Sequence, residues 1–143
     1  MKVSQQTIQQ WVQEDVPYFD LTTHLLGIGE KRATIEVYAR EEAIVSGSEE
    51  ARIICNQAGL DVTLFTPSGS AIAAYQPFFA MKGDFATLNQ IGKVIQNIFE
   101  YASGIATRTQ RLNRLAKSVN PEVSILTTRK VFPGTKELAI KSV

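Results

Sequence analysis

Three adjacent residues, Thr128, Arg129 and Lys130, are the strongest chemical signal in the sequence. They directly follow an apolar segment, residues 123–127, whose pattern predicts a short buried strand, and a proline–glycine pair then opens a predicted helix. In α/β folds, ligand-binding groups collect at the carboxyl ends of such strands. Arginine holds a carboxylate with two hydrogen bonds, lysine acts as a point charge, and a helix N-terminus adds N–H donors. The spacing predicts a carboxylate or phosphate site, and an exposed loop without a ligand is the other interpretation.

The other reactive residue types give weaker signals. His24 is the only histidine, which excludes a metal site built on several histidines. Cys55 is the only cysteine, so the chain forms no intrachain disulfide, and its place on the apolar side of a predicted helix indicates a small buried hydrophobe. A Gly-Ile-Gly run at residues 27–29 lacks the strand and helix that a dinucleotide site requires, so a turn is expected there. No metal site is predicted.

Composition limits the class of protein. Of the 143 residues, 44% are hydrophobic and 20% are charged, which is typical of a globular chain, and the formal net charge is +1. This balance gives no general attraction to nucleic acid or to a membrane surface, so an anion must be bound locally. Because the N-terminus is polar and no apolar run approaches the ~20 residues of a membrane span, a cytoplasmic protein is expected.

The first part of the chain reads as short strands mixed with helices, which is an α/β pattern. A helix is expected over residues 4–14, with Ser4 as its N-cap, and a second over 48–58, where Ser46 and Glu49 fit a capping box. Alternating or apolar runs predict strands at residues 32–39, 43–45, 60–65, 71–75 and 78–82.

Two helices are expected next. The first covers residues 84–102, is capped by Asp84, and has an apolar face made of Leu88, Ile91, Ile95, Ile98, Phe99 and Ala102. Lys93, Asn97 and Glu100 share the opposite face, which spacing alone assigns to solvent. A break is expected at residues 103–104, and a second helix over 105–118 carries four cations that suit a solvated surface or a subunit contact: Arg108, Arg111, Arg114 and Lys117.

Four blocks in the right order resemble the quinolinate phosphoribosyltransferase superfamily. They are Glu14-Asp15 with Asp20-Leu21-Thr22-Thr23, then Arg40 to Gly47, then Asn97 with Ser103-Gly104-Ile105-Ala106-Thr107, and finally Thr128-Arg129-Lys130 with Pro133-Gly134. The residues at Val16-Pro17-Tyr18-Phe19-Asp20 and at Thr127 resemble those of the ModD, or molybdenum-operon, branch. Quinolinate enzymes usually have a glycine–aspartate pair at the first of these places and an aspartate at the second.

The resemblance implies a fold in two parts. Residues 1–103 would form the family's N-terminal α/β domain, and residues 104–143 would begin a C-terminal (β/α) barrel that this chain leaves incomplete. The last predicted helix carries Leu138 and Ile140, which are expected to be exposed unless the rest of a barrel covers them.

The resemblance also implies site residues. Thr128, Arg129 and Lys130 match the family motif whose arginine and lysine contact a carboxylated pyridine and the phosphoribosyl donor, and Lys130 is expected to serve catalysis. Lys93 stands where the family has an arginine that reaches into the neighbouring subunit's site, so a homodimer with a shared site is expected. Lysine keeps the charge but lacks the two-pronged guanidinium, which argues against quinolinate itself as the substrate.

The activity implied is transfer of a phosphoribosyl group from phosphoribosyl pyrophosphate to an anionic acceptor, with Mg²⁺ bound at the leaving pyrophosphate. The family's His-Arg pair, a further lysine, and the Glu and Asp that bind magnesium and ribose would follow residue 143. The alternative is a non-catalytic oxyanion-binding or accessory protein of molybdate transport, because ModD-type genes are associated with molybdate uptake operons and the three cations would also suit an oxyanion.

These expectations predict that the 143-residue chain alone has no phosphoribosyltransferase activity. The reason is that the residues expected to hold the metal and the ribose are not in it. A steady-state assay with phosphoribosyl pyrophosphate, magnesium and quinolinate measures this, and clear turnover above the uncatalysed rate would contradict it.

Overall fold

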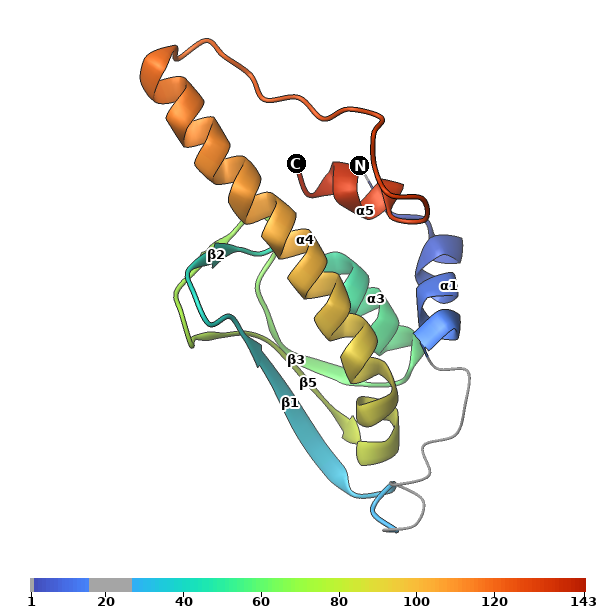
Figure 1. The fold of residues 1–143 in the computed structure, drawn as a ribbon. Coiled ribbons are helices and arrows are strands. Elements are labelled where there is room, and N and C mark those ends of the chain that lie inside the picture. Colours follow the sequence, from blue (N-terminus) through green and yellow to red (C-terminus); the bar gives the residue numbers. More distant parts are fainter. Residues whose placement is uncertain (1, 16–26) are drawn as a thin grey trace.

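The computed structural model describes residues 2–15 and 27–143 of the chain, and a three-stranded antiparallel sheet with helices on one face lies at its centre (Figure 1). The elements are α1 (Gln5–Asp15), β1 (Arg32–Tyr38), β2 (Ala43–Ile44), α3 (Ser48–Gln57), β3 (Asp61–Phe65), β4 (Ala71–Ile72), β5 (Pro77–Asp84), α4 (Phe85–Val119) and α5 (Lys136–Lys141). The α/β fold class is therefore confirmed. His24 and the residues 16–23 of the sequence blocks lie outside the described residues.

Strand β5 is the middle of the sheet because it pairs with β1 on one side and β3 on the other. Its residues Phe78 to Met81 are all buried, and they form the most buried run of the sheet. Strand β1 alternates between half-buried and exposed residues, so only one of its faces packs on the helices. Strands β2 and β4 form a separate two-stranded ladder.

The first half of α4 supplies the helical side of the core. It buries Leu88, Ile91, Val94, Ile95, Ile98, Phe99 and Ala102. The Phe99 ring packs edge-on against Phe78 at 4.9 Å between ring centroids and lies 5.3 Å from Phe79. The predicted cap at Asp84 is confirmed, since its carboxylate accepts a hydrogen bond from the Thr87 backbone N–H at 3.1 Å. The apolar face predicted from helical spacing is thus the face that packs on β5.

Cys55 is fully buried on α3, with its sulfur 3.6 Å from the Met81 sulfur. Burial raises the pKa of the thiol to about 12, so it stays protonated and unreactive at neutral pH. The prediction that Cys55 is a buried hydrophobe is confirmed.

The predicted helix break at residues 103–104 is wrong, because α4 runs without interruption for 35 residues. Gly104 sits in open space, and a single glycine weakens a helix without having to end it. The hydroxyls on either side hold the helix to β2 and to the residues that follow it: Thr107 Oγ1 accepts the Ile44 N–H at 2.9 Å, and Ser103 Oγ accepts the Ser46 N–H at 3.0 Å. The division of the chain near residue 103 stays a prediction.

The predicted strand at residues 123–127 is also wrong. These residues form an irregular, largely exposed segment between α4 and α5, and the final helix begins at Lys136 rather than at the proline–glycine pair. The physical reason is that a strand needs a neighbour, and the described residues place no other strand beside this segment. Leu138, expected to be exposed, is buried, whereas Ile140 is half-buried.

The capping box predicted at Ser46 and Glu49 does not form. Gly47 is the N-cap of α3, at a φ of 97°, and no side chain caps the helix. Ser46 Oγ instead lies 3.0 Å from Ser142 Oγ, and the Glu49 carboxylate accepts hydrogen bonds from Ser68. Both side chains therefore bond to residues far away in the sequence instead of capping α3.

A buried ion cluster joins α5 to α3. Lys141 Nζ lies 2.6 Å from a carboxylate oxygen of Glu50, which is buried, and 2.9 Å from one of Glu49. Burial alone would lower the pKa of Lys141, but the two glutamates outweigh it and raise that pKa above its ordinary value. Burial would likewise raise the pKa of Glu49, yet hydrogen bonds from Ser68 and Lys141 bring it down to about 2. Lys141 and Glu49 thus both stay ionised across the neutral range.

Two glycine substitutions should have opposite effects on stability. We expect Gly104→Ala to raise the free energy of unfolding by about 0.5–1 kcal/mol, because it removes backbone freedom inside an exposed helix. Gly47→Ala should lower it by about 2–4 kcal/mol, since its Cβ would stand 2.7 Å from Ile98 Cγ2 at a left-handed φ. Urea unfolding followed by circular dichroism measures both. Destabilisation by Gly104→Ala would contradict the continuous helix.

Removing the cation of the buried cluster should be costly. We expect Lys141→Met to lower the free energy of unfolding by about 3–5 kcal/mol, because it leaves Glu50 buried without a partner charge. Adding Glu50→Gln to that variant should recover part of the loss. Lys117→Met, at an exposed lysine of α4, is the matched control and should change stability by less than about 0.5 kcal/mol. Equal effects of the two lysine substitutions in urea unfolding would show that the cluster contributes little.

Candidate functional site

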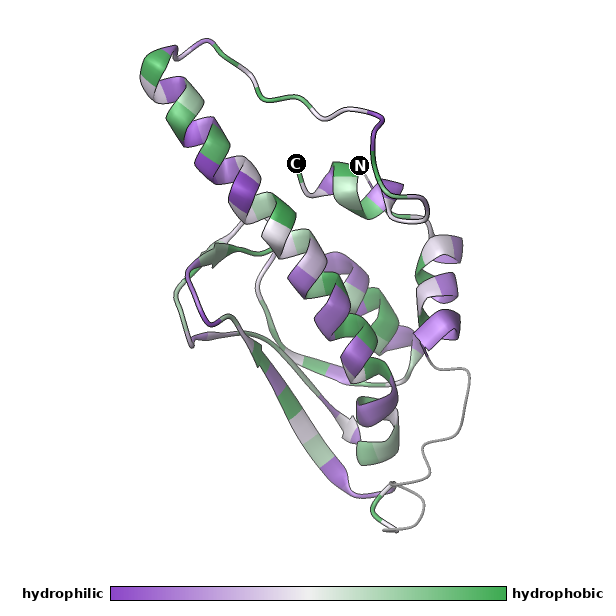
Figure 2. Cartoon of the chain, viewed as in Figure 1, coloured by the Kyte–Doolittle hydropathy of each residue, from purple (hydrophilic) through white to green (hydrophobic). Residues whose placement is uncertain are grey.

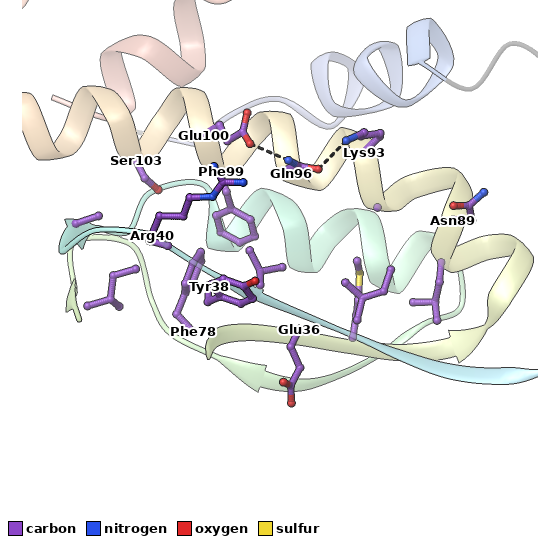
Figure 3. A pocket seen from close by; sticks show the side chains of 18 residues that line it. Glu36, Tyr38, Arg40, Phe78, Asn89, Lys93, Gln96, Phe99, Glu100 and Ser103 are labelled. Atoms are coloured by element: carbon purple, nitrogen blue, oxygen red, sulfur yellow. Dashed lines mark hydrogen bonds between the residues drawn. The ribbon is translucent and has the colours of Figure 1, made fainter. Parts of the chain in front are cut away.

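A cleft of about 770 Å³ opens between β1 and the first half of α4 (Figure 3). Its floor is apolar, with β1 and β5 residues such as Ile35, Phe78 and Met81. Its polar lining comes mainly from α4 and from the end of β1, and consists of Arg40, Asn89, Lys93, Gln96, Glu100 and Ser103. The volume and the mixture of an apolar floor with a few polar groups are those of a small-molecule site.

Lys93 projects from the exposed side of α4 into this lining. Its Nζ donates a hydrogen bond to Gln96 Oε1 at 3.0 Å, and Gln96 Nε2 donates to Glu100 Oε1 at 2.8 Å. The three residues lie three and four positions apart, so they are neighbours on the helix surface, and Figure 3 shows the chain of hydrogen bonds. This bond uses one of the three N–H donors of the ammonium group.

Arg40 is the second cation of the cleft, and the sequence patterns gave it no role. Figure 3 shows its side chain extending from the end of β1 toward α4, beside Phe99. The only sequence signal for it is its place directly after the strand, within the block from Arg40 to Gly47. The cleft also contains Glu36 and Glu100, so its lining holds two cations and two carboxylates, although Figure 3 shows Glu36 pointing away from α4. This balance means that strong anion binding requires cations from elsewhere.

The polar face predicted for α4 divides between two cavities. Lys93 and Glu100 line the cleft, whereas Asn97 lines a separate cavity of about 280 Å³ between α1, α4 and α5, with Trp11 and Tyr101. Lys93, Asn97 and Glu100 are all exposed, as the prediction of a solvent-facing side states. The prediction does not include the two cavities that these residues line.

Thr128, Arg129 and Lys130 lie outside the cleft. They are exposed in the irregular segment before α5, where Thr128 Oγ1 accepts the Lys130 backbone N–H at 3.2 Å. The sequence predicts a site here because the three residues would follow the carboxyl end of a strand. That strand is not formed in the described residues, so this argument for a site does not apply to them. A single copy of the chain does not bring them together with Lys93, and their role in binding stays a prediction.

No metal centre is found in the described part of the chain. Within residues 2–15 and 27–143, no group of three or more His, Cys, Asp or Glu side chains lies close enough to hold an ion. The expected binding of magnesium stays a prediction. In the same ranges, no helix is both long and apolar enough to cross a membrane.

Comparison with known proteins identifies the family. The model of the family described as "Quinolinate phosphoribosyl transferase, N-terminal domain" matches residues 20–103. The chain belongs to this family. Among the solved structures that it matches, the nicotinate-nucleotide pyrophosphorylase from Francisella tularensis is 25% identical with a TM-score of 0.83, over 99% of this chain and 51% of that one. The enzyme of that name from Ehrlichia chaffeensis has a TM-score of 0.86 at 24% identity and supports the fold alone.

The curated relatives confirm the resemblance to the ModD branch. "Putative pyrophosphorylase ModD" of Rhodobacter capsulatus is 35% identical over 132 residues, covering 92% of this chain and 51% of that protein. A "Probable nicotinate-nucleotide pyrophosphorylase [carboxylating]" of Methanothermobacter thermautotrophicus is 27% identical over 89% of this chain and 46% of its own length. The chain thus spans about half the length of the curated relatives it matches.

Proposed function

We propose that this chain forms the N-terminal half of a ModD-like phosphoribosyltransferase of the nicotinate-nucleotide pyrophosphorylase type. The reaction is transfer of the phosphoribosyl group of phosphoribosyl pyrophosphate to an anionic acceptor, a pyridine carboxylate or a related nitrogen nucleophile. The observation that carries the proposal is the position of Lys93 over the cleft of about 770 Å³, in a chain of this family. Both substrates are anions, and an oriented ammonium group on a cleft with an apolar floor suits a flat, charged ring.

The chemistry requires charge placement more than a nucleophile. Loss of pyrophosphate leaves a cation-like sugar, and the protein assists by holding the two reactants and the departing charge in position. Lys93 would bind the acceptor's carboxylate through a single ammonium contact, which favours an acceptor other than quinolinate. Lys130 and Arg129 would bind the phosphoribosyl donor, with Thr128 beside them. Magnesium would neutralise the pyrophosphate from ligands outside the described residues.

A site shared between two copies supplies the cations that the cleft lacks. The lining of the cleft in one copy holds as many carboxylates as cations, and the Arg129 and Lys130 of that copy lie elsewhere on the chain. In a homodimer, the Arg129 and Lys130 of the second copy would face Lys93 of the first. Three cations at one place repel one another unless an anion lies between them, so such an arrangement favours binding of a substrate with several negative charges.

Substitution of Lys93 tests the site. We expect Lys93→Ala to weaken binding of phosphoribosyl pyrophosphate or of a dicarboxylated pyridine by about 1.5–3 kcal/mol, because it removes one charge-assisted hydrogen bond. Isothermal titration calorimetry measures the affinity, and circular dichroism shows that the fold is kept. Lys117→Ala, on the same helix but outside the cleft, is the control and should bind like the unsubstituted chain.

Two results would count against the proposal. Unchanged affinity in a folded Lys93→Ala protein would show that Lys93 is a solvent-exposed residue without a role in binding. Binding of molybdate in place of phosphoribosyl pyrophosphate, with loss of that binding in Lys93→Ala, would favour the accessory role in molybdate transport.

A further inference from the structure

Arg40 is an arginine without a protein partner that lines the cleft from the end of β1. At the start of the same strand, Arg32 pairs with Asp61 at 3.4 Å, whereas no hydrogen bond or ion pair joins the guanidinium of Arg40 to another described residue. Figure 3 shows this side chain reaching toward α4, beside Phe99. A guanidinium whose N–H donors are not bonded to the protein can hold a planar anion with two parallel hydrogen bonds.

The backbone at the end of β1 departs from regular strand geometry. The pairing of β1 with β5 shifts register between Val37 and Tyr38, an irregularity of the kind that re-aims the side chains near it. The Tyr75 backbone N–H donates to the Ala39 carbonyl oxygen at 2.7 Å, and Tyr75 has a φ of 60°, in the left-handed region that favours glycine. Backbone strain of this kind is concentrated at ligand-binding sites. The strained contact holds the residue directly before Arg40.

The two cations of the cleft lie at different ends of its apolar floor. Arg40 lies beside Phe99, and Lys93 is six positions before Phe99 on α4, which is about 9 Å along the helix axis. Figure 3 shows Gln96 between the two cations. The floor includes Phe78 from β5 and apolar residues of β1, and Figure 2 shows hydrophobic and hydrophilic bands alternating along that strand. A flat ring on this floor therefore has a cation at each end.

The two carboxylates of the cleft do not pair with these cations. Figure 3 shows Glu36 pointing away from α4, and Glu100 accepts a hydrogen bond from Gln96 Nε2 at 2.8 Å. The carboxylates still reduce the overall attraction of the cleft for anions. The position of each cation, more than the total charge, therefore decides which anionic ring fits, since complementary charges give specificity more than affinity.

We propose that the acceptor bound in this cleft is a flat ring with anionic groups at opposite positions, one held by Arg40 and the other by Lys93. Arg40 supplies the two-pronged contact that a lysine at position 93 cannot make. A ring with its carboxylates on adjacent carbons presents both of them to the same end of the cleft. The inference rests on the proposed function and names the substrate class of that site.

Two pyridine dicarboxylates of equal charge test the inference. Isocinchomeronate has its carboxylates on opposite ring carbons, and quinolinate has them on adjacent carbons, so general attraction to cations is the same for both. In isothermal titration calorimetry, the unsubstituted chain should bind isocinchomeronate at least ~10-fold more tightly, because only this ring reaches both cations with charge-assisted hydrogen bonds.

Arg40→Lys is the decisive variant, because it keeps the charge and removes the two-pronged guanidinium. It should weaken binding of isocinchomeronate at least ~10-fold and bring the preference between the two rings below ~3-fold. Arg32→Lys, the same change on the same strand but outside the cleft, is the matched control and should leave both affinities unchanged. Circular dichroism shows that both variants are folded.

Three results overturn the inference. They are equal or tighter binding of quinolinate by the unsubstituted chain, an unchanged preference in Arg40→Lys, and failure of both rings to bind. In each case, binding of phosphoribosyl pyrophosphate that is lost in Lys93→Ala would leave the proposed function in place. Conversely, a preference that depends on Arg40, in a chain that binds no phosphoribosyl pyrophosphate, would keep the site for this class of ring and overturn the proposed transfer.

Discussion

Helix α4 has one continuous hydrogen-bond ladder from Phe85 to Val119, yet its two halves meet different surroundings. The first half must bury seven apolar residues on the sheet and at the same time carry Lys93 on its outer side. The second half leaves the sheet and exposes Leu112, Leu115 and Val119. Because a helix is rigid over this length, the position of the cleft and the position of these three exposed residues are fixed relative to each other.

The sequence predicts well those parts of the fold whose signal is local. The alternation of β1, the apolar run of β5, the Asp84 cap and the apolar face of α4 all appear where the residue pattern places them, since each depends on neighbours within a turn or a strand. The failures have a common physical cause. Ser103, Ser46 and Glu49 were interpreted through neighbouring residues, but their actual hydrogen-bond partners are between 19 and 96 residues away. Residues 123–127 have the composition of a strand and lack the second strand that would make them one.

The candidate site also depends on contacts between residues that are far apart in the sequence. The spacing of Lys93 alone assigns it to a solvated face, and only the family resemblance gives it a role, because the cleft that it borders depends on the distance between β1 and α4. Arg40 was inside a recognised block but received no role, because nothing in a linear sequence shows that a residue after a strand reaches across to a helix. Cations can be counted from a sequence, but the carboxylates that offset them, such as Glu100 beside Gln96, become apparent only in three dimensions.

The ion cluster of α3 and α5 has a consequence for the order in which the chain can fold during synthesis. Glu50 is made early and lies on a helix whose core partners are available once α4 has left the ribosome. Its carboxylate cannot be buried at low cost until Lys141 emerges, 91 residues later, and α5 also ties down the N-terminus through Glu137 and the Ser4 backbone N–H at 2.8 Å. A nascent chain that ends before residue 141 therefore carries the Glu50 carboxylate of α3 without its cationic partner. Helix α5, although it is six residues long, therefore supplies the cation that completes a contact begun on α3.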